Sequence, residues 1–259
     1  MDIVVLLKQV PDTEALIRVA EDKKSIKTGD LKWVVNPYDE YAVEEAVRLR
    51  EAHGGTVTIL SAGGEKATEA IRAALAMGAD KGVRVNDGGA ALHDPLVLAR
   101  ILAAAIKTLP FDLIIAGQRA VDDDNYITGP AVAELLGIPQ ATMVVKAAVA
   151  SGHITCHRAV EGGVLVTRTP LPMLFTAQKG LNEPRFASMM GIMAAKKKPI
   201  AVVNLSDIGI SAEQAAQARM RVLGISPPPE RSAGKIIEGS SASEKAASLA
   251  ACLRQAALI

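Results

Sequence analysis

Short apolar runs alternate with helical segments through the first half of this 259-residue chain. Apolar and β-branched residues fill the runs at 3–7, 56–60 and 113–116, and glycines close most of the helical segments. This alternation predicts a mostly parallel, doubly wound α/β sheet with helices on both faces. We expect the helices at 38–53, 65–77, 95–107 and 128–136, and a short extended segment at 83–85.

The pattern changes after residue 140. Residues 141–148, 153–159 and 163–168 are typical of antiparallel strands separated by glycine turns, and 171–177 of one more strand. A helix is expected at 186–195, ended by three lysines and Pro199. The last stretch has three prolines, then small polar residues, then a helix near 243–258. We therefore expect an α/β domain at 1–225 with an added antiparallel section, and at 226–259 a C-terminal arm and helix that need a surface to lie on. A flexible tail is the alternative.

Composition excludes several classes of function. The chain has 29 basic and 28 acidic residues and 3% aromatic residues, so neither charge nor base stacking favours nucleic acid. Its two cysteines show neither metal-ligand spacing nor a disulfide framework. No apolar stretch reaches the roughly 18 residues of a membrane span. We expect a cytoplasmic protein.

Three consecutive carboxylates, Asp122, Asp123 and Asp124, stand where a strand hands over to a helix. Ligands of doubly wound sheets bind beyond the carboxyl ends of the strands. The loops 8–12, 61–64 and 117–128 should therefore converge on one crevice, although no Gly-x-Gly-x-x-Gly follows the first strand. The acidic loop fits a helix cap, a metal site, the wall of a nucleotide pocket or a solvated turn. We expect no metal, since one loop rarely supplies the geometry for magnesium.

Several stretches together resemble the β subunit of the electron transfer flavoprotein family, from residue 1 to about residue 255. They are VVNPYDEYAVEEAVRLRE (34–51), EAIRAALAMGADKGVRV (69–85), GQRAVDDDNYITGP (117–130), LNEPRF (181–186) and MAAKKKPI (193–200). The resemblance implies half of an αβ heterodimer, with FAD held mainly in the α subunit and its ring near the β subunit. It also implies an AMP in this chain that does no redox chemistry.

The resemblance further implies an electron carrier rather than an enzyme. Electrons would come from acyl-CoA-type dehydrogenases, as in fatty acid oxidation, and pass to a quinone oxidoreductase or another acceptor. The matching nucleotide-site residues are Leu6, Asn36, Pro37, Tyr38, Asp39, Ala62, Gly117, Gln118, Arg119, Ala120, Val121, Asp122, Asp123, Asp124, Asn125, Tyr126, Ile127 and Thr128.

The residue types agree with a phosphate site. Gly117 lets the backbone approach a purine, and the amides of residues 125–128, with the Thr128 hydroxyl, can point at a phosphate from a helix N-terminus. Carboxylates repel phosphate, so at least one should accept bonds from backbone amides or ribose hydroxyls. Another is expected to pair with Arg119.

The bound nucleotide has an alternative. In the family, AMP loops commonly read Asp-Asp-Asp-x-x-Gln-Thr-Gly, whereas bifurcating members, which hold a second FAD and use NADH, have glycine at the position of Asp123. The Asp123 side chain favours AMP, and Ile127 in place of Gln weakens that inference. A third class, an adenine-nucleotide enzyme or sensor, lacks a P-loop or Ser-Gly-Gly-x-Asp loop here.

The resemblance also assigns a partner-binding loop. Leu181, Asn182, Glu183, Pro184 and Arg185 match a loop that anchors the β subunit to dehydrogenases, with Leu181 as the apolar tip between charged neighbours. The alternative is structural: Leu181 belongs to the core, and Asn182 caps a helix beginning near Pro184.

Overall fold

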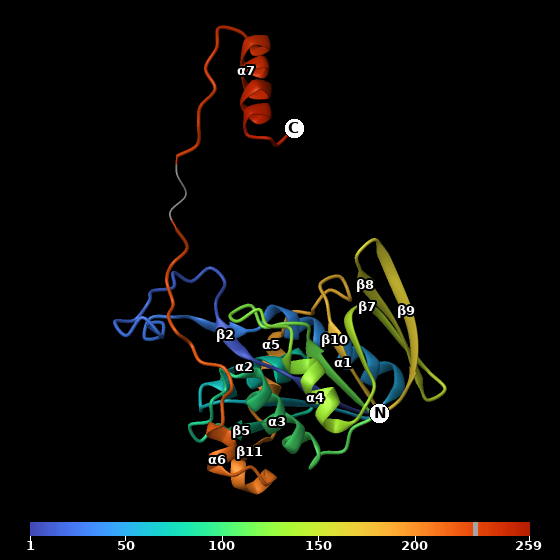
Figure 1. The fold of residues 1–259 in the computed structure, drawn as a ribbon. Helices are drawn as coiled ribbons and strands as arrows, with labels where there is room; N and C mark the ends of the chain where they lie inside the picture. The colour runs from blue at the N-terminus through green and yellow to red at the C-terminus, as the bar shows by residue number, and fades with distance from the viewer. Residues whose placement is uncertain (230–232) are drawn as a thin grey trace. The chain divides into compact units, whose positions relative to one another are not determined.

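In the computed structural model, which describes residues 1–229 and 233–259, nine strands form one sheet in the order β11-β5-β4-β1-β6-β10-β7-β8-β9 (Figure 1). Neighbours from β11 to β7 pair in parallel, and β7-β8 and β8-β9 pair antiparallel. β2 (Gln9–Pro11) and β3 (Trp33–Val35) form a separate antiparallel ribbon. The strands of the main sheet are β1 (Asp2–Leu6), β4 (Thr56–Ala62), β5 (Lys81–Asn86), β6 (Leu113–Gly117), β7 (Gln140–Ala150), β8 (His153–Val160), β9 (Gly163–Pro170), β10 (Met173–Ala177) and β11 (Ile200–Asn204).

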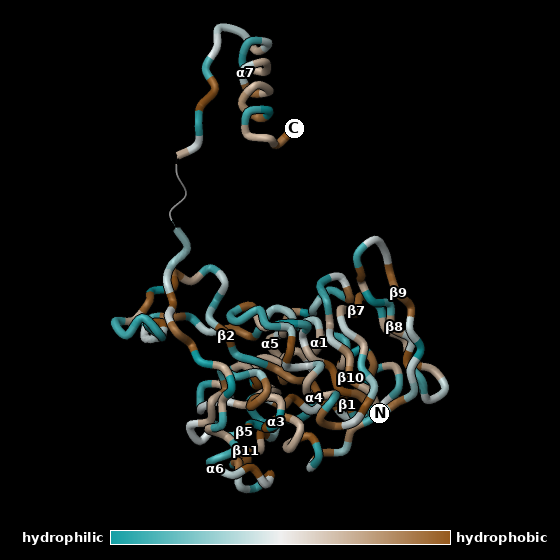
Figure 2. Tube along the Cα trace, viewed as in Figure 1, coloured by the Kyte–Doolittle hydropathy of each residue, from teal (hydrophilic) through white to brown (hydrophobic). Residues whose placement is uncertain are grey.

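Helices cover both faces of the sheet because successive strand residues point to opposite sides. In β1, Ile3 and Val5 join a core shared with α1, α2 and α5, whereas Val4 and Leu6 join a core shared with α3 and α4. Hydrophobic residues accordingly run along β1 and β10 in the middle of the sheet (Figure 2). The helices are α1 (Pro37–His53), α2 (Ala67–Met77), α3 (Pro95–Ile106), α4 (Thr128–Leu136), α5 (Met189–Ala195), the 3-10 helix η1 (Leu205–Ile208), α6 (Ala212–Ala216) and α7 (Ala242–Gln255).

The predicted architecture is confirmed, although the β2–β3 ribbon, η1 and α6 were not predicted and two further elements differ. The doubly wound parallel section and the antiparallel hairpins lie where the sequence placed them. Helix α5 begins at Met189 rather than 186, because Ser188 caps it: the Ser188 hydroxyl accepts a bond from the Gly191 amide at 3.0 Å. Strand β11, which was not expected, adds an edge beside β5.

The chain divides into two compact units, Met1–Gly224 and Ile225–Ile259. In the second unit, Ser241 caps α7, and none of the α7 side chains is buried. Residues 230–232 of the predicted arm lie outside the described residues. Within the described residues, no helix is long and apolar enough to cross a bilayer.

Candidate functional site

A buried carboxylate joins the ends of two central strands. Asp39, in the first turn of α1, accepts hydrogen bonds from the backbone amides of Lys8 (2.7 Å) and Gly117 (3.1 Å), which follow β1 and end β6 respectively. The Asn36 amide group donates a third bond at 2.9 Å. Burial raises the pKa of Asp39 to about 7, although all three bonds act to lower it. Asp39 therefore holds together the carboxyl ends of β1 and β6, where a ligand is expected.

Asn36 orients the start of the acidic loop. Its amide nitrogen also donates to the carbonyl of Arg119 at 2.9 Å, and its oxygen accepts from the amide of Val121 at 3.2 Å. Although Asn36 immediately precedes α1, its side chain does not cap that helix. The side chain is instead buried and links α1 to the loop after β6 through its hydrogen bonds.

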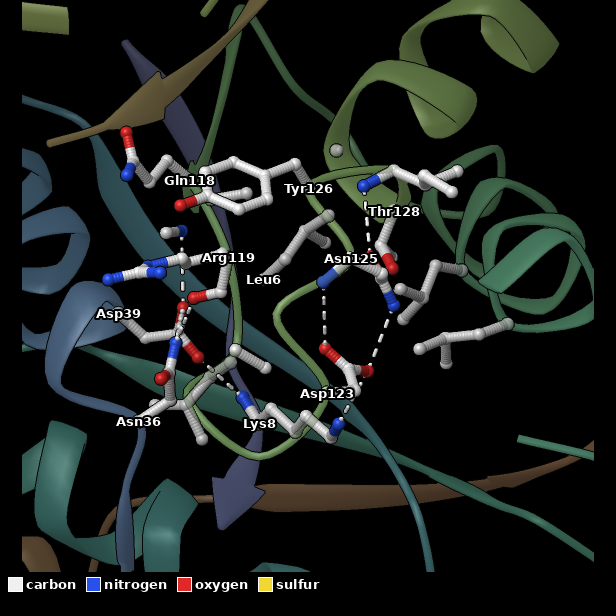
Figure 3. Close-up of a pocket in the computed structure, with 18 of the residues that line it drawn as sticks. Leu6, Lys8, Asn36, Asp39, Gln118, Arg119, Asp123, Asn125, Tyr126 and Thr128 are labelled. Carbon is white, nitrogen blue, oxygen red and sulfur yellow. Dashed lines mark hydrogen bonds and ion pairs between the residues drawn. The ribbon is translucent and has the colours of Figure 1, made fainter. Parts of the chain in front are cut away.

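These elements surround a pocket at the carboxyl ends of β1, β4 and β6 (Figure 3). The space, counted out to its open mouth, is about 600 Å³. Leu6, Leu98 and Leu102 contribute apolar walls, and Lys8 and Asp123 lie at one polar edge. The pocket thus combines an apolar interior with a few polar groups, as ligand pockets usually do.

Most of the residues predicted from sequence line this pocket. They are Leu6, Asn36, Asp39, Ala62, Gly117, Gln118, Arg119, Ala120, Asp123, Asn125, Tyr126, Ile127 and Thr128. The predicted residues that do not line it are Pro37, Tyr38, Val121, Asp122 and Asp124. The pocket also includes Leu7, Leu98, Leu102, Ala116 and Gly129, which the sequence reasoning missed, and Lys8, which begins a loop expected at the crevice but was not named as a site residue.

The misses have different causes. Leu98 and Leu102 sit four apart on α3, where an apolar pair is indistinguishable from ordinary core spacing. Lys8 carried a usable signal: it is a cation placed directly after a strand whose end was already expected to face the ligand.

All three carboxylates of the acidic loop have basic partners. The Lys8 ammonium lies 2.8 Å from Asp122 and 3.1 Å from Asp123, and the Arg119 guanidinium pairs with Asp124 as expected. The Asn125 side chain also donates to Asp123 at 2.9 Å. No cluster of three or more metal-ligating groups is found in the described part of the chain.

Arg119 is held between two aromatic rings. Its guanidinium carbon lies 4.9 Å from the ring centre of Tyr38 and 5.3 Å from that of Tyr126, and it donates to the Tyr38 hydroxyl at 2.8 Å. The bond to Tyr38 raises the pKa of Arg119, so its charge is permanent. Arg119 therefore contacts Tyr38, Asp124 and Tyr126 together.

The loop ends at the N-terminus of α4, which no side chain caps. The amide of Ile127 donates to the Asn125 side chain at 2.9 Å, and that of Asn125 lies 3.4 Å from an oxygen of Asp123. The amides of Tyr126 and Thr128 have no such partner within the described residues. Unpaired amides at a helix N-terminus are suited to bind an anion.

A second candidate region is the loop of residues 181–185. Arg185 donates to Glu44 (2.8 Å) and Glu51 (2.7 Å), and Asn182 donates to the carbonyl of Tyr41 and to Glu45, both at 3.0 Å. These bonds tie the loop to α1, and no helix begins at Pro184, so the capping role considered for Asn182 is wrong.

Leu181 itself is half-buried and packs against the core shared by α1 and α2. The exposed apolar side chains come later: Phe186 is 99% exposed and Met189 76% exposed, and Met190 and Met193 are exposed as well. The structure thus places the apolar surface after the predicted tip rather than at Leu181.

Comparison with known proteins agrees with the resemblance. A family model described as the electron transfer flavoprotein domain matches residues 24–208. The chain is 40% identical over 260 residues to the electron transfer flavoprotein subunit beta of Bacillus subtilis, covering all of both chains. It is 41% identical to that of Syntrophomonas wolfei (92% of this chain, 90% of the relative) and 39% identical to that of Mus musculus (90% and 91%). The chain therefore belongs to the electron transfer flavoprotein family as a β subunit, a role in electron transfer that implies an α-subunit partner.

Proposed function

We propose that this chain carries no catalytic residues of its own and serves as the nucleotide-binding half of an electron carrier, with FAD held mainly by the α subunit. The observation that carries the proposal is the pocket beyond β1, β4 and β6, bounded by the uncapped N-terminus of α4. An apolar interior suits a purine, and free amides at a helix N-terminus suit a phosphate.

The nucleotide that we propose for this pocket is AMP, bound as a structural ligand. Asp123 supports this choice, because its side chain lines the pocket and is held in place by Lys8 and Asn125. A longer dinucleotide would have to pass this fixed side chain. The alternative is a bifurcating subunit, with a second FAD in the pocket and NADH as the donor.

The proposed electron donors are acyl-CoA-type dehydrogenases, and the proposed acceptor is a quinone oxidoreductase or a similar protein. Support comes from the exposed apolar side chains of Phe186, Met189 and Met190, which follow the loop of residues 181–185. Grouped exposed apolar residues are typical of protein-binding surfaces. The ties from Arg185 and Asn182 to α1 would hold this surface in a fixed shape.

We propose that residues 226–259 dock on the α subunit. No side chain of helix α7 is buried against the described residues of its own unit, and Leu249, Leu258 and Ile259 are exposed. Deleting the chain from Ser226 onward should abolish copurification with the α subunit and leave the nucleotide-binding fold intact. A truncated chain that still copurified in full yield would contradict this role.

The AMP site is tested by Thr128→Ala in the heterodimer. Thr128 is the first residue of α4 and lines the pocket. Loss of a hydroxyl contact to phosphate should cost about 1 kcal/mol of binding free energy, lowering the AMP content and the melting temperature. Thr28→Ala, an exposed threonine of the β2–β3 connection, is the matched control. Unchanged AMP content and melting temperature in Thr128→Ala would count against the site.

A further inference from the structure

The acidic loop confronts the proposed ligand with an electrostatic problem. A nucleoside monophosphate brings negative charge to a pocket beside three carboxylates, of which Asp123 lines the wall. Like charges a few ångströms apart repel strongly where water is partly excluded. The loop amides can bind a phosphate well only if these carboxylates are neutralised.

Lys8 neutralises two of the three. Its ammonium lies 2.8 Å from Asp122 and 3.1 Å from Asp123, residues more than a hundred positions away in the sequence. Burial alone would lower the pKa of Lys8, but attraction to the two carboxylates raises it above its ordinary value, so the side chain stays charged. Figure 3 shows the Lys8 side chain extended along the pocket edge to Asp123.

The backbone of Lys8 is equally fixed. Its amide donates at 2.7 Å to Asp39. This buried carboxylate also accepts from the amide of Gly117, the residue from which the acidic loop begins. Lys8 is therefore attached to the rigid sheet by its backbone and to the acidic loop by its side chain. This placement suits a residue that positions other groups.

The loop needs such support because its backbone is strained. Asp124 and Tyr126 have φ values of 54° and 60°, a left-handed conformation that non-glycine residues rarely adopt. Strained residues persist where surrounding contacts over-determine them. Arg119 supplies those contacts to Asp124 and Tyr126, and Lys8 holds the preceding residues, Asp122 and Asp123.

We propose that Lys8 is a positioning residue: by neutralising Asp122 and Asp123, it allows the amides of the acidic loop to bind a phosphate beside these carboxylates. In this arrangement the phosphate of a nucleoside monophosphate is bound by the loop amides, and Lys8 acts on it through the two carboxylates. The inference rests on the proposed AMP binding and adds a residue to it.

The test measures binding of radiolabelled AMP to the nucleotide-depleted heterodimer by equilibrium dialysis. Lys8→Gln should raise the Kd for AMP at least about tenfold, as expected when carboxylates near a bound anion lose their partner. The effect should shrink in about 1 M salt, where the screening length is only ~3 Å. Lys32→Gln is the matched control, because it removes an ion pair of similar length, at 2.7 Å to Asp12, outside the pocket.

One further variant separates positioning from direct contact. Lys8→Gln combined with Asp122→Asn and Asp123→Asn should return the Kd to within about threefold of the wild type, because the unpaired carboxylates are gone. A triple variant that binds no better than Lys8→Gln would overturn the inference, since Lys8 would then contact the phosphate itself. An unchanged Kd in Lys8→Gln would overturn it as well.

The inference remains testable if Lys8→Gln does not fold. Asp122→Asn/Asp123→Asn with Lys8 intact should bind AMP at least as tightly as the wild type, and a tenfold loss would contradict the neutralising role. A wild-type heterodimer that took up no AMP would overturn the proposed AMP binding itself. Normal uptake by the wild type with an unchanged Lys8→Gln variant would overturn only the role of Lys8.

Discussion

Asp39 occupies the space in which residue 117 would carry a β-carbon. A β-carbon built on Gly117 would lie 2.2 Å from an oxygen of Asp39, and the Gly117 amide donates to that same oxygen at 3.1 Å. The absence of a side chain at 117 is thus what allows β6 to bond with the buried carboxylate and to begin the acidic loop in its observed direction.

Gly117→Ala should therefore destabilise the fold and damage the pocket together. Overpacking of this kind costs about 1–3 kcal/mol in the free energy of unfolding, and displacement of Asp39 would release Lys8 and Asn36 from their bonds. Denaturant unfolding of the heterodimer and its content of the proposed AMP ligand measure the two effects. Gly163→Ala is the control, since a β-carbon there meets open space. Equal behaviour of the two variants would contradict the role of Gly117.

Asp39 should also make stability depend on pH. Burial raises its pKa from 3.8 to about 7, so between about pH 4 and 7 the folded chain keeps a proton that the unfolded chain releases. The resulting stabilisation is fully present below about pH 4 and is lost as the pH rises through about 7.

Asp39→Asn removes this titration and provides the comparison. The unfolding free energy of the wild type minus that of Asp39→Asn should fall by up to about 1.4 kcal/mol per pH unit between about pH 5 and 7. Both proteins are unfolded as heterodimers at one fixed concentration. A difference that stays level or increases over this range would show that Asp39 is ionised in the folded chain.

Periodicity predicted the parallel sheet and the antiparallel hairpins, because it is a local signal, whereas most pocket residues were assigned through the family resemblance and agree with the positions of the strand ends. Contacts between distant segments could not be predicted in the same way. Sequence alone did not indicate that Lys8 would meet Asp122, or that Lys198 would donate to the carbonyls of Leu75 and Ala79 at the end of α2. The lysine run does follow the end of α5, as expected, but Lys198 bonds to the end of α2. The partner of a long lysine side chain depends on tertiary packing.

Arg185 should behave as a structural clamp. It pairs with the buried Glu44 and with Glu51, and its backbone amide also donates to Glu44 at 3.1 Å. Arg185→Gln should cost about 1–3 kcal/mol in unfolding free energy, because among the described residues Glu44 then keeps only Arg48 as a charged partner. Lys32→Gln breaks an exposed ion pair and should cost clearly less unfolding free energy. An equally small loss in Arg185→Gln would contradict the clamp and leave Arg185 available to a partner.

Leu181 and Met189 allow the docking surface to be located. Leu181 packs on the core, so Leu181→Ala should lower the unfolding free energy. Because Leu181 is only half-buried, the loss should lie at or below the lower end of the ~2–5 kcal/mol range for fully buried leucines. Met189 is exposed, so Met189→Ala should leave the unfolding free energy unchanged and slow electron transfer from the proposed dehydrogenase donor, with a loss of about 1–3 kcal/mol in the free energy of docking. Electron-transfer kinetics and thermal unfolding of the Leu181→Ala and Met189→Ala heterodimers show which residue belongs to the docking surface. A stable Leu181→Ala variant with impaired transfer would restore Leu181 as the anchor.

The identity of the nucleotides in the purified heterodimer is the most direct test of the proposed function. Denaturation releases all bound nucleotides, which are then identified by mass and quantified by absorbance. The pocket bounded by Asp123 and the N-terminus of α4 predicts one FAD and one AMP per heterodimer. Two FAD and no AMP would contradict AMP binding and assign the chain to the bifurcating type.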